Sequence, residues 1–166
     1  MMTTTDNDTF RIRDAAGVYR SVPKDRLIEG AKHCILQRFN QDAIAIKSPT
    51  DTEDYLQTLL ADLEHEVFGF ILLDNRHRVL GCRELFRGTI DGTSVYPREC
   101  VKLALELNAA AVICFHNHPS GISEPSQADE RITRRLKAAF ELVDIRILDH
   151  LVVGQTVTSM ASRGLL

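Results

Sequence analysis

An apolar run that ends in a pair of histidines constrains this chain more than any other feature. Residues 109–115 form a continuous apolar segment, and residues 116–119 follow it with the letters HNHP. A short apolar run of this kind is typical of a buried strand. Because proline has no backbone N–H, Pro119 favours the end of the strand directly after the histidines. The sequence therefore predicts a buried strand that carries two imidazoles at its end.

The complete pattern is H-x-H-P-x6-S-x2-D, which places a serine and an aspartate shortly after the histidines. On a strand, residues i and i+2 point to the same side, so His116 and His118 can face one metal ion. Two imidazoles and a carboxylate are typical of a catalytic zinc site that keeps a fourth position for water. We therefore predict that His116, His118 and Asp129 bind one Zn²⁺ per chain, although manganese or iron also accepts such ligands.

Ser126 and Asp129 have a second interpretation, because S-x-x-D is also the capping box of a helix that begins at the serine. The two roles are compatible, since a helix N-terminus aimed at the preceding loop would hold Asp129 near the histidines. We expect Asp129 to serve as a ligand and Ser126 as a catalytic hydrogen-bond donor.

The bulk composition suits one soluble domain with a hydrophobic core: 166 residues, 44% hydrophobic and 26% charged. A net charge of −3 gives no electrostatic footprint for nucleic acid. We interpret the densest basic cluster as a solvated helix face; it comprises Arg131, Arg134, Arg135 and Lys137. The sequence contains no apolar run long enough for a membrane span, no secretory signal and no C-x-x-C pair, which favours the cytoplasm.

Periodicity and turn residues predict interleaved helices and strands, and hence an α/β or α+β fold with a mixed sheet. Residues 1 to about 21 are expected to be a loosely ordered tail. The predicted helices cover 22–39, 51–63 with Thr50 as N-cap, 97–107 and 126–142. The predicted strands cover 67–73, 79–87, 109–115, 145–153 and 156–160.

A hydrolytic zinc site also needs a general base for the attacking water. The candidates are Glu64, Glu66, Glu84 and Glu99. Glu66 directly precedes the predicted strand 67–73, and Gly69 allows close packing there. Glu84 is the reserve candidate.

Residues 66–72, with the letters EVFGFIL, precede the H-x-H-P-x6-S-x2-D pattern by about 50 residues. Together they resemble the motif of the JAMM (MPN+, JAB) metalloproteases. The resemblance implies Glu66 as base, Ser126 as oxyanion donor, and the two histidines with Asp129 as zinc ligands. It also implies a JAB/MPN-like mixed sheet flanked by helices, similar to the layered cytidine deaminase fold.

Within that superfamily, the chain is most similar to RadC-like JAB domain proteins. The similarity rests on six short motifs: SP at 48–49, GT at 88–89, PRE at 97–99, HNHPSG at 116–121, EPSQAD at 124–129 and LDH at 148–150. It implies a tail and helix over 1–46 and a JAB/MPN-like metallohydrolase domain over 47–166. Because 1–46 is too short for the helix-hairpin-helix region of full-length members, the chain resembles the short, stand-alone members. The negative net charge of the chain argues against the DNA-repair role associated with the family.

The function expected from these residues is zinc-dependent hydrolysis of a peptide or isopeptide bond in a peptide or protein substrate. The alternative is a non-catalytic metal-binding or scaffold module, against which the complete ligand set argues. An HNH nuclease is disfavoured, because the residues of that motif are spread through its fold and are not adjacent as they are here. A zinc deaminase is disfavoured, because it needs H-x-E followed by C-x-x-C, and position 118 is a histidine. For His150 we expect a structural role rather than one in orienting a ligand. The oligomeric state stays open, with a homodimer as one option.

Overall fold

A computed structural model describes the chain except residues 1–2, 7–8, 16, 41–48, 61–62 and 89–93. The chain divides into two compact units, Met1–Arg38 and Phe39–Leu166. In the described part of the chain, no helix has the length and apolar character needed to cross a membrane.

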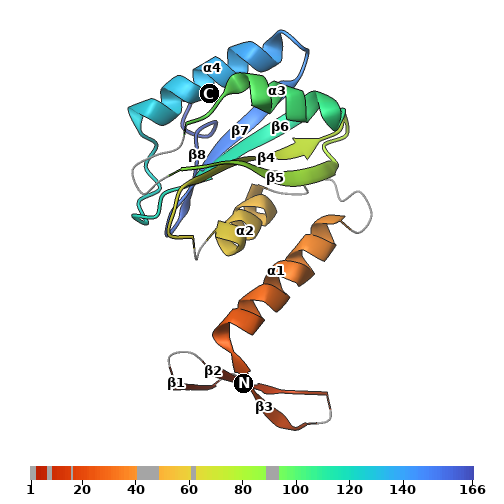
Figure 1. Ribbon diagram of the computed structural model, residues 1–166, viewed down its shortest axis with the longest axis vertical. Coiled ribbons are helices and arrows are strands. Elements are labelled where there is room, and N and C mark those ends of the chain that lie inside the picture. The colour runs from red at the N-terminus through yellow and green to blue at the C-terminus, as the bar shows by residue number, and fades with distance from the viewer. Residues whose placement is uncertain (1–2, 7–8, 16, 41–48, 61–62, 89–93) are drawn as a thin grey trace. The chain divides into compact units, whose positions relative to one another are not determined.

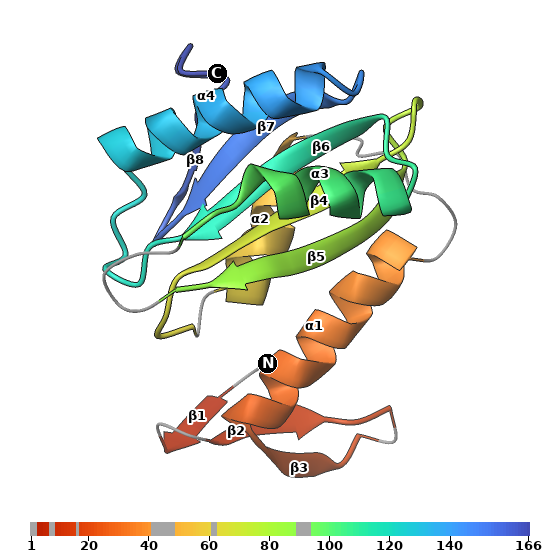
Figure 2. The same ribbon diagram turned by 45° about the horizontal axis from the view of Figure 1, so that its top comes forward.

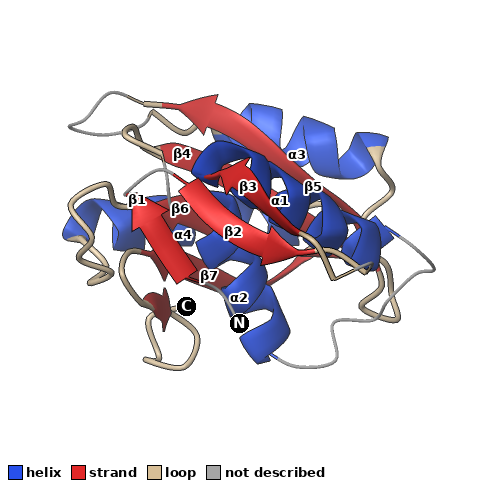
Figure 3. Ribbon diagram, turned by 90° about the horizontal axis from the view of Figure 1, so that it is seen from below, coloured by secondary structure: helices blue, strands red, loops and turns tan. Residues whose placement is uncertain are grey.

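The first unit holds a three-stranded antiparallel sheet of β1 (Thr3–Asp6), β2 (Thr9–Arg13) and β3 (Tyr19–Pro23), in that order, followed by helix α1 (Lys24–Asn40) (Figure 3). The prediction of a loosely ordered tail to residue 21 was therefore wrong.

The physical reason lies in a short hairpin signal between β2 and β3. Phe10 and Ile12 alternate with arginines in β2, which is the two-residue period of a strand. Asp14 then closes the turn, because its carboxylate and its carbonyl accept hydrogen bonds from the N–H groups of Val18 and Gly17. The predicted start of the following helix at Val22 moves to Lys24, since Val22 still pairs with Phe10 in the sheet.

The second unit is built on a five-stranded mixed sheet with the order β5-β4-β6-β7-β8. Its strands are β4 (Val67–Leu73), β5 (Val79–Arg87), β6 (Ala111–Asn117), β7 (Arg146–Val153) and β8 (Val157–Ser159). β6 and β7 are parallel, and the other neighbours are antiparallel. The predicted mixed sheet flanked by helices is confirmed, with the bounds of β4 and β5 as expected.

Helices cover both faces of this sheet. Helices α3 (Pro97–Glu106) and α4 (Gln127–Glu141) lie on one face, and α2 (Pro49–Leu60) lies on the other (Figures 1 and 2). The core under α3 and α4 takes alternate residues of β4, namely Phe68, Phe70 and Leu72, as the two-residue period of a strand requires.

Strand β6 begins at Ala111 and extends to Asn117, two residues beyond the predicted end at Phe115. Its last residues stay in the sheet because β4 and β7 flank them, with His116 paired to Phe68 and to Val152. Val112 and Cys114 belong to the core under α3 and α4. By the same alternation His116 faces α4, and this register brings the histidine to the helix that carries the aspartate.

Candidate metal centre

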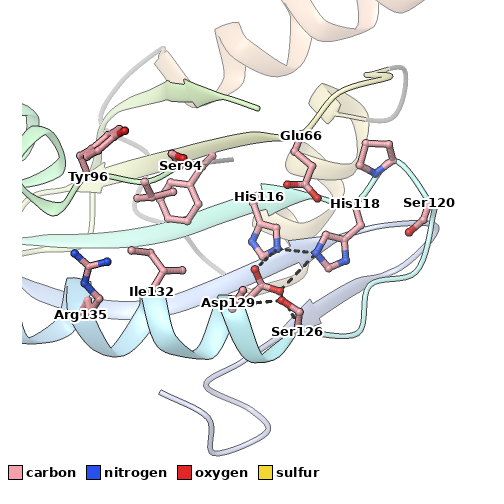
Figure 4. A pocket seen from close by; sticks show the side chains of 14 residues that line it. Glu66, Ser94, Tyr96, His116, His118, Ser120, Ser126, Asp129, Ile132 and Arg135 are labelled. Carbon is pink, nitrogen blue, oxygen red and sulfur yellow. Dashed lines mark hydrogen bonds and ion pairs between the residues drawn. The ribbon is translucent and has the colours of Figure 1, made fainter. Parts of the chain in front are cut away.

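His116, His118 and Asp129 converge at the end of β6 and the start of α4 (Figure 4). One potential ligand atom from each lies within 4.8 Å of the others. The two Nε2 atoms are 2.9 Å apart, and the Asp129 carboxylate oxygens lie 3.3 Å from His116 Nε2 and 3.6 Å from His118 Nε2. The structure thus brings together the three residues predicted to bind one ion.

Asp129 caps its helix and faces the histidines at the same time. Its Oδ2 accepts a hydrogen bond from the Ser126 N–H at 2.6 Å, and the Ser126 Oγ accepts one from the Asp129 N–H at 3.2 Å. This reciprocal pair is the capping box predicted from the spacing. The box fixes the aspartate with its other oxygen turned toward His116, so the two interpretations describe one arrangement.

The electrostatics of the cluster keep Asp129 ionised. Burial raises the pKa of its carboxyl, but the imidazoles of His116 and His118, which donate to it when they are protonated, outweigh burial and hold this pKa well below its usual range. The same contact with Asp129 raises the pKa of His118. A carboxylate that stays charged among imidazoles is suited to bind a cation.

A backbone carbonyl sets the tautomer of His118. Its Nδ1 lies 2.7 Å from the Ile122 oxygen, which can only accept, so Nδ1 carries the hydrogen in the neutral ring. The Nε2 lone pair of His118 is then directed into the cluster.

A buried hydrogen-bond relay, formed by Thr133 and His150, sets the tautomer of His116. Thr133 Oγ1 donates to the Asp129 carbonyl at 2.6 Å and lies 2.6 Å from His150 Nδ1, which must therefore donate to the hydroxyl. Burial lowers the pKa of His150, which keeps that ring neutral and its Nε2 free to accept. His116 Nδ1, 2.8 Å away, consequently donates to it.

When both rings are neutral, His116 and His118 therefore present unprotonated Nε2 atoms to each other and to a carboxylate. Acceptors this close repel one another unless a cation or a proton lies between them. The donor set thus fits a metal ion, and these residues could bind one.

His150 thus contacts a candidate ligand, whereas sequence reasoning favoured a structural role. His150 lies 34 residues after His116, and only the parallel pairing of β6 with β7 places it beside that ring. The sequence signal that could have indicated this contact was the place of His150 within the short motif LDH at 148–150.

Glu66 lies directly before β4 and lines the same pocket as the histidines, with its carboxylate directed toward them (Figure 4).

Asn117, the middle residue of the H-N-H triplet, holds the backbone on both sides of Glu66. Its Oδ1 accepts from the Val67 N–H at 2.8 Å, and its Nδ2 donates to the His65 carbonyl at 3.1 Å. Sequence reasoning missed this role, because Asn117 points away from the ligands.

The close packing expected at Gly69 is confirmed: a Cβ there would lie 2.4 Å from the Phe115 ring of β6 and from the Arg83 carbonyl of β5. Of the four glutamates considered from the sequence, only Glu66 lines the pocket. Glu84, the reserve candidate, pairs with Arg87 along β5.

The pocket has a volume of about 690 Å³. It extends from the ligands along α4 to Tyr96, Ile132 and Arg135 (Figure 4). All four residues of the basic cluster are exposed, as predicted for a solvated helix face. Arg135 also lines the pocket, whereas Arg134 lies outside it and pairs with Glu130. The helical rotation that separates these two arginines was not visible in the composition of the cluster.

Comparison with known proteins agrees with this geometry. The model of the RadC-like JAB domain family matches residues 46–165. The chain belongs to this family. The match covers β4 to β8 and all three candidate ligands.

Curated relatives are similar over most of the chain. A UPF0758 protein of Vibrio cholerae is 55% identical over 84% of this chain and 87% of its own length. One of Marinobacter nauticus is 62% identical over 73% of this chain, and one of Halorhodospira halophila is 51% identical over 97%. The matched part is about half of the Marinobacter protein, 54%. These names state no activity.

Proposed function

We propose that this RadC-like JAB domain is a zinc-dependent peptidase or isopeptidase. The observation that carries the proposal is the convergence of the Nε2 atoms of His116 and His118 with the Asp129 carboxylate, beside Glu66 in one pocket. Two imidazoles and one carboxylate are a typical ligand set of hydrolytic zinc. The ion would supply Lewis acidity and a water of lowered pKa. The four free thiols support a reducing, cytoplasmic setting.

Glu66 is the proposed general base. It takes the proton of the attacking water and returns it to the leaving amine nitrogen. Its place is fixed by the two hydrogen bonds of Asn117 to the residues on either side, which limits how far the carboxylate can move from the pocket.

Ser126 is the proposed donor to the oxygen that becomes negative during attack. Its Oγ already accepts the Asp129 N–H, so its own hydrogen is left to donate. Because the capping box fixes the serine backbone, the hydroxyl is held at the pocket wall before the substrate arrives. Loss of one such donor costs about 10² to 10³ in rate.

The test is cleavage of a peptide and isopeptide library by the zinc-loaded chain and by Glu66→Gln. Glu64→Gln is the matched control, because Glu64 is an exposed glutamate two residues away. We expect Glu66→Gln to retain zinc and to lose at least 10²-fold in rate, with Glu64→Gln unchanged. Full activity of Glu66→Gln would reject Glu66 as base. Zinc binding without cleavage of any member would favour a non-catalytic metal-binding module.

A further inference from the structure

Residues of α4 form one wall of the pocket. Ile132 lies three residues from both Asp129 and Arg135, so it neighbours each of them on the helix surface, and all three line the pocket (Figure 4). With a rise of about 1.5 Å per residue, Arg135 lies about 9 Å along the helix axis from the candidate ligand Asp129. The pocket thus has a metal-binding end and a cationic end, with Ile132 between them.

The guanidinium of Arg135 has no hydrogen bond or ion pair with any residue that the structure describes. Its neighbour Arg134, by contrast, reaches Glu130 at 3.4 Å on the same helix. A guanidinium binds a carboxylate with two parallel hydrogen bonds, which gives it a strong preference for such a ligand. Arg135 is therefore available to a ligand that enters the pocket.

The charge of the pocket points to the same ligand. Its charged lining residues are Glu66, Asp129 and Arg135. Once a divalent ion is bound, the two carboxylates balance its charge and the positive charge of Arg135 is left over. An anionic group at this end would restore neutrality, whereas a cationic one would meet repulsion.

We propose that the pocket selects amide substrates with a carboxylate two to three residues from the scissile bond and an apolar side chain between the two. The spacing follows because an extended chain covers about 3.3 to 3.6 Å per residue. Phe68, Val95 and Ile132 are apolar residues of the pocket lining and would contact the apolar side chain. This inference rests on the proposed hydrolase function, and it names the substrate class. The carboxylate is either a chain terminus or an acidic side chain.

The experiment measures binding by titration calorimetry to the full zinc-loaded chain, with Glu66→Gln in all proteins so that peptides stay intact. The probes are acetyl-Leu-Ala-Ala with a free carboxylate, the same peptide as its carboxamide, and acetyl-Leu-Glu-Ala carboxamide. The variants are Arg135→Gln and, as the matched control, Arg134→Gln. Thermal unfolding of both variants verifies that the fold is retained.

We expect two proteins, the one with both arginines intact and Arg134→Gln, to bind one of the two charged peptides about tenfold more tightly than the uncharged acetyl-Leu-Ala-Ala carboxamide. Arg135→Gln is expected to lose that preference. Preference for the free carboxylate identifies a chain terminus, and preference for the glutamyl peptide identifies an acidic side chain. Because direct binding of a carboxylate to zinc is the same in both variants, their difference isolates Arg135.

An equal preference in Arg135→Gln and Arg134→Gln would overturn the inference, as would no measurable binding of any probe with both arginines intact. Neither result depends on turnover. Absence of cleavage by the chain with Glu66 intact would reject the hydrolase function and leave a selective binding result standing.

Discussion

The two sides of the candidate metal centre are built in different ways. His116 is held in the sheet by side chains 34 and 17 residues apart in sequence, through His150 and Thr133, and its side chain is only 7% exposed. His118 is held by the carbonyl of Ile122, four residues away in a loop, and its side chain is 16% exposed. One side depends on tertiary packing and the other on a local turn, so substitutions should affect them unequally.

The largest effect on turnover is expected at Asn117, on the buried side. Asn117→Ala removes both bonds that hold the backbone around Glu66. We expect about 10²-fold slower hydrolysis, because a base displaced by about 1 Å loses its alignment with the water. Zinc content should stay the same, since the ligands are untouched. Steady-state kinetics with metal analysis of the same sample checks this, and an unchanged rate would show that Asn117 does not position the base.

The next effect is expected on metal affinity at His150. His150→Leu leaves the His116 Nδ1–H without its acceptor and releases the ring to turn or to change tautomer. We expect zinc affinity to fall about 10- to 100-fold, as for other residues that orient a metal ligand. Competition with a chelator measures the dissociation constant. Nitrogen NMR of the zinc-free protein would contradict the relay if it found the His116 hydrogen on Nε2.

Thr133 tests the same relay one step further from the ligand. Thr133→Val removes the acceptor of the His150 N–H and should weaken zinc binding about fivefold and destabilise the fold by about 1 to 2 kcal/mol. Thr133→Ser keeps the hydroxyl, so it should restore the affinity even if the lost methyl lowers stability. Equal zinc affinities for the valine and serine variants would exclude the hydroxyl from the relay.

The smallest effect is expected on the loop side. Gly121 has φ of +81°, and a Cβ there would lie 3.2 Å from the Gln155 side chain. Gly121→Ala should therefore strain the turn that presents the Ile122 carbonyl to His118, at a cost of about 1 kcal/mol. We expect a two- to fivefold loss of zinc affinity by the same chelator assay. A loss larger than that of His150→Leu would reverse the comparison.

The division between the two sides also explains what the sequence could predict. The candidate ligands and the capping box follow from local spacing, and β4 and β5 follow from apolar runs bounded by turns. The contacts of His150 and Asn117 depend on the register of β6 against its neighbours, which no local pattern encodes. The place of Arg135 depends on how α4 is rotated over the sheet. In the first unit, the hairpin was not predicted from the sequence, because its strands are short and rich in arginine. Backbone pairing and one turn support this hairpin.

The most direct test of the account is the metal content of the untagged chain, measured by plasma mass spectrometry beside His118→Ala. The convergence of two unprotonated imidazole nitrogens with an ionised carboxylate predicts about one zinc ion per chain, lost in the variant. Absence of metal from the wild-type protein, both as purified and after incubation with zinc, would contradict the central claim that this cluster is a metal centre.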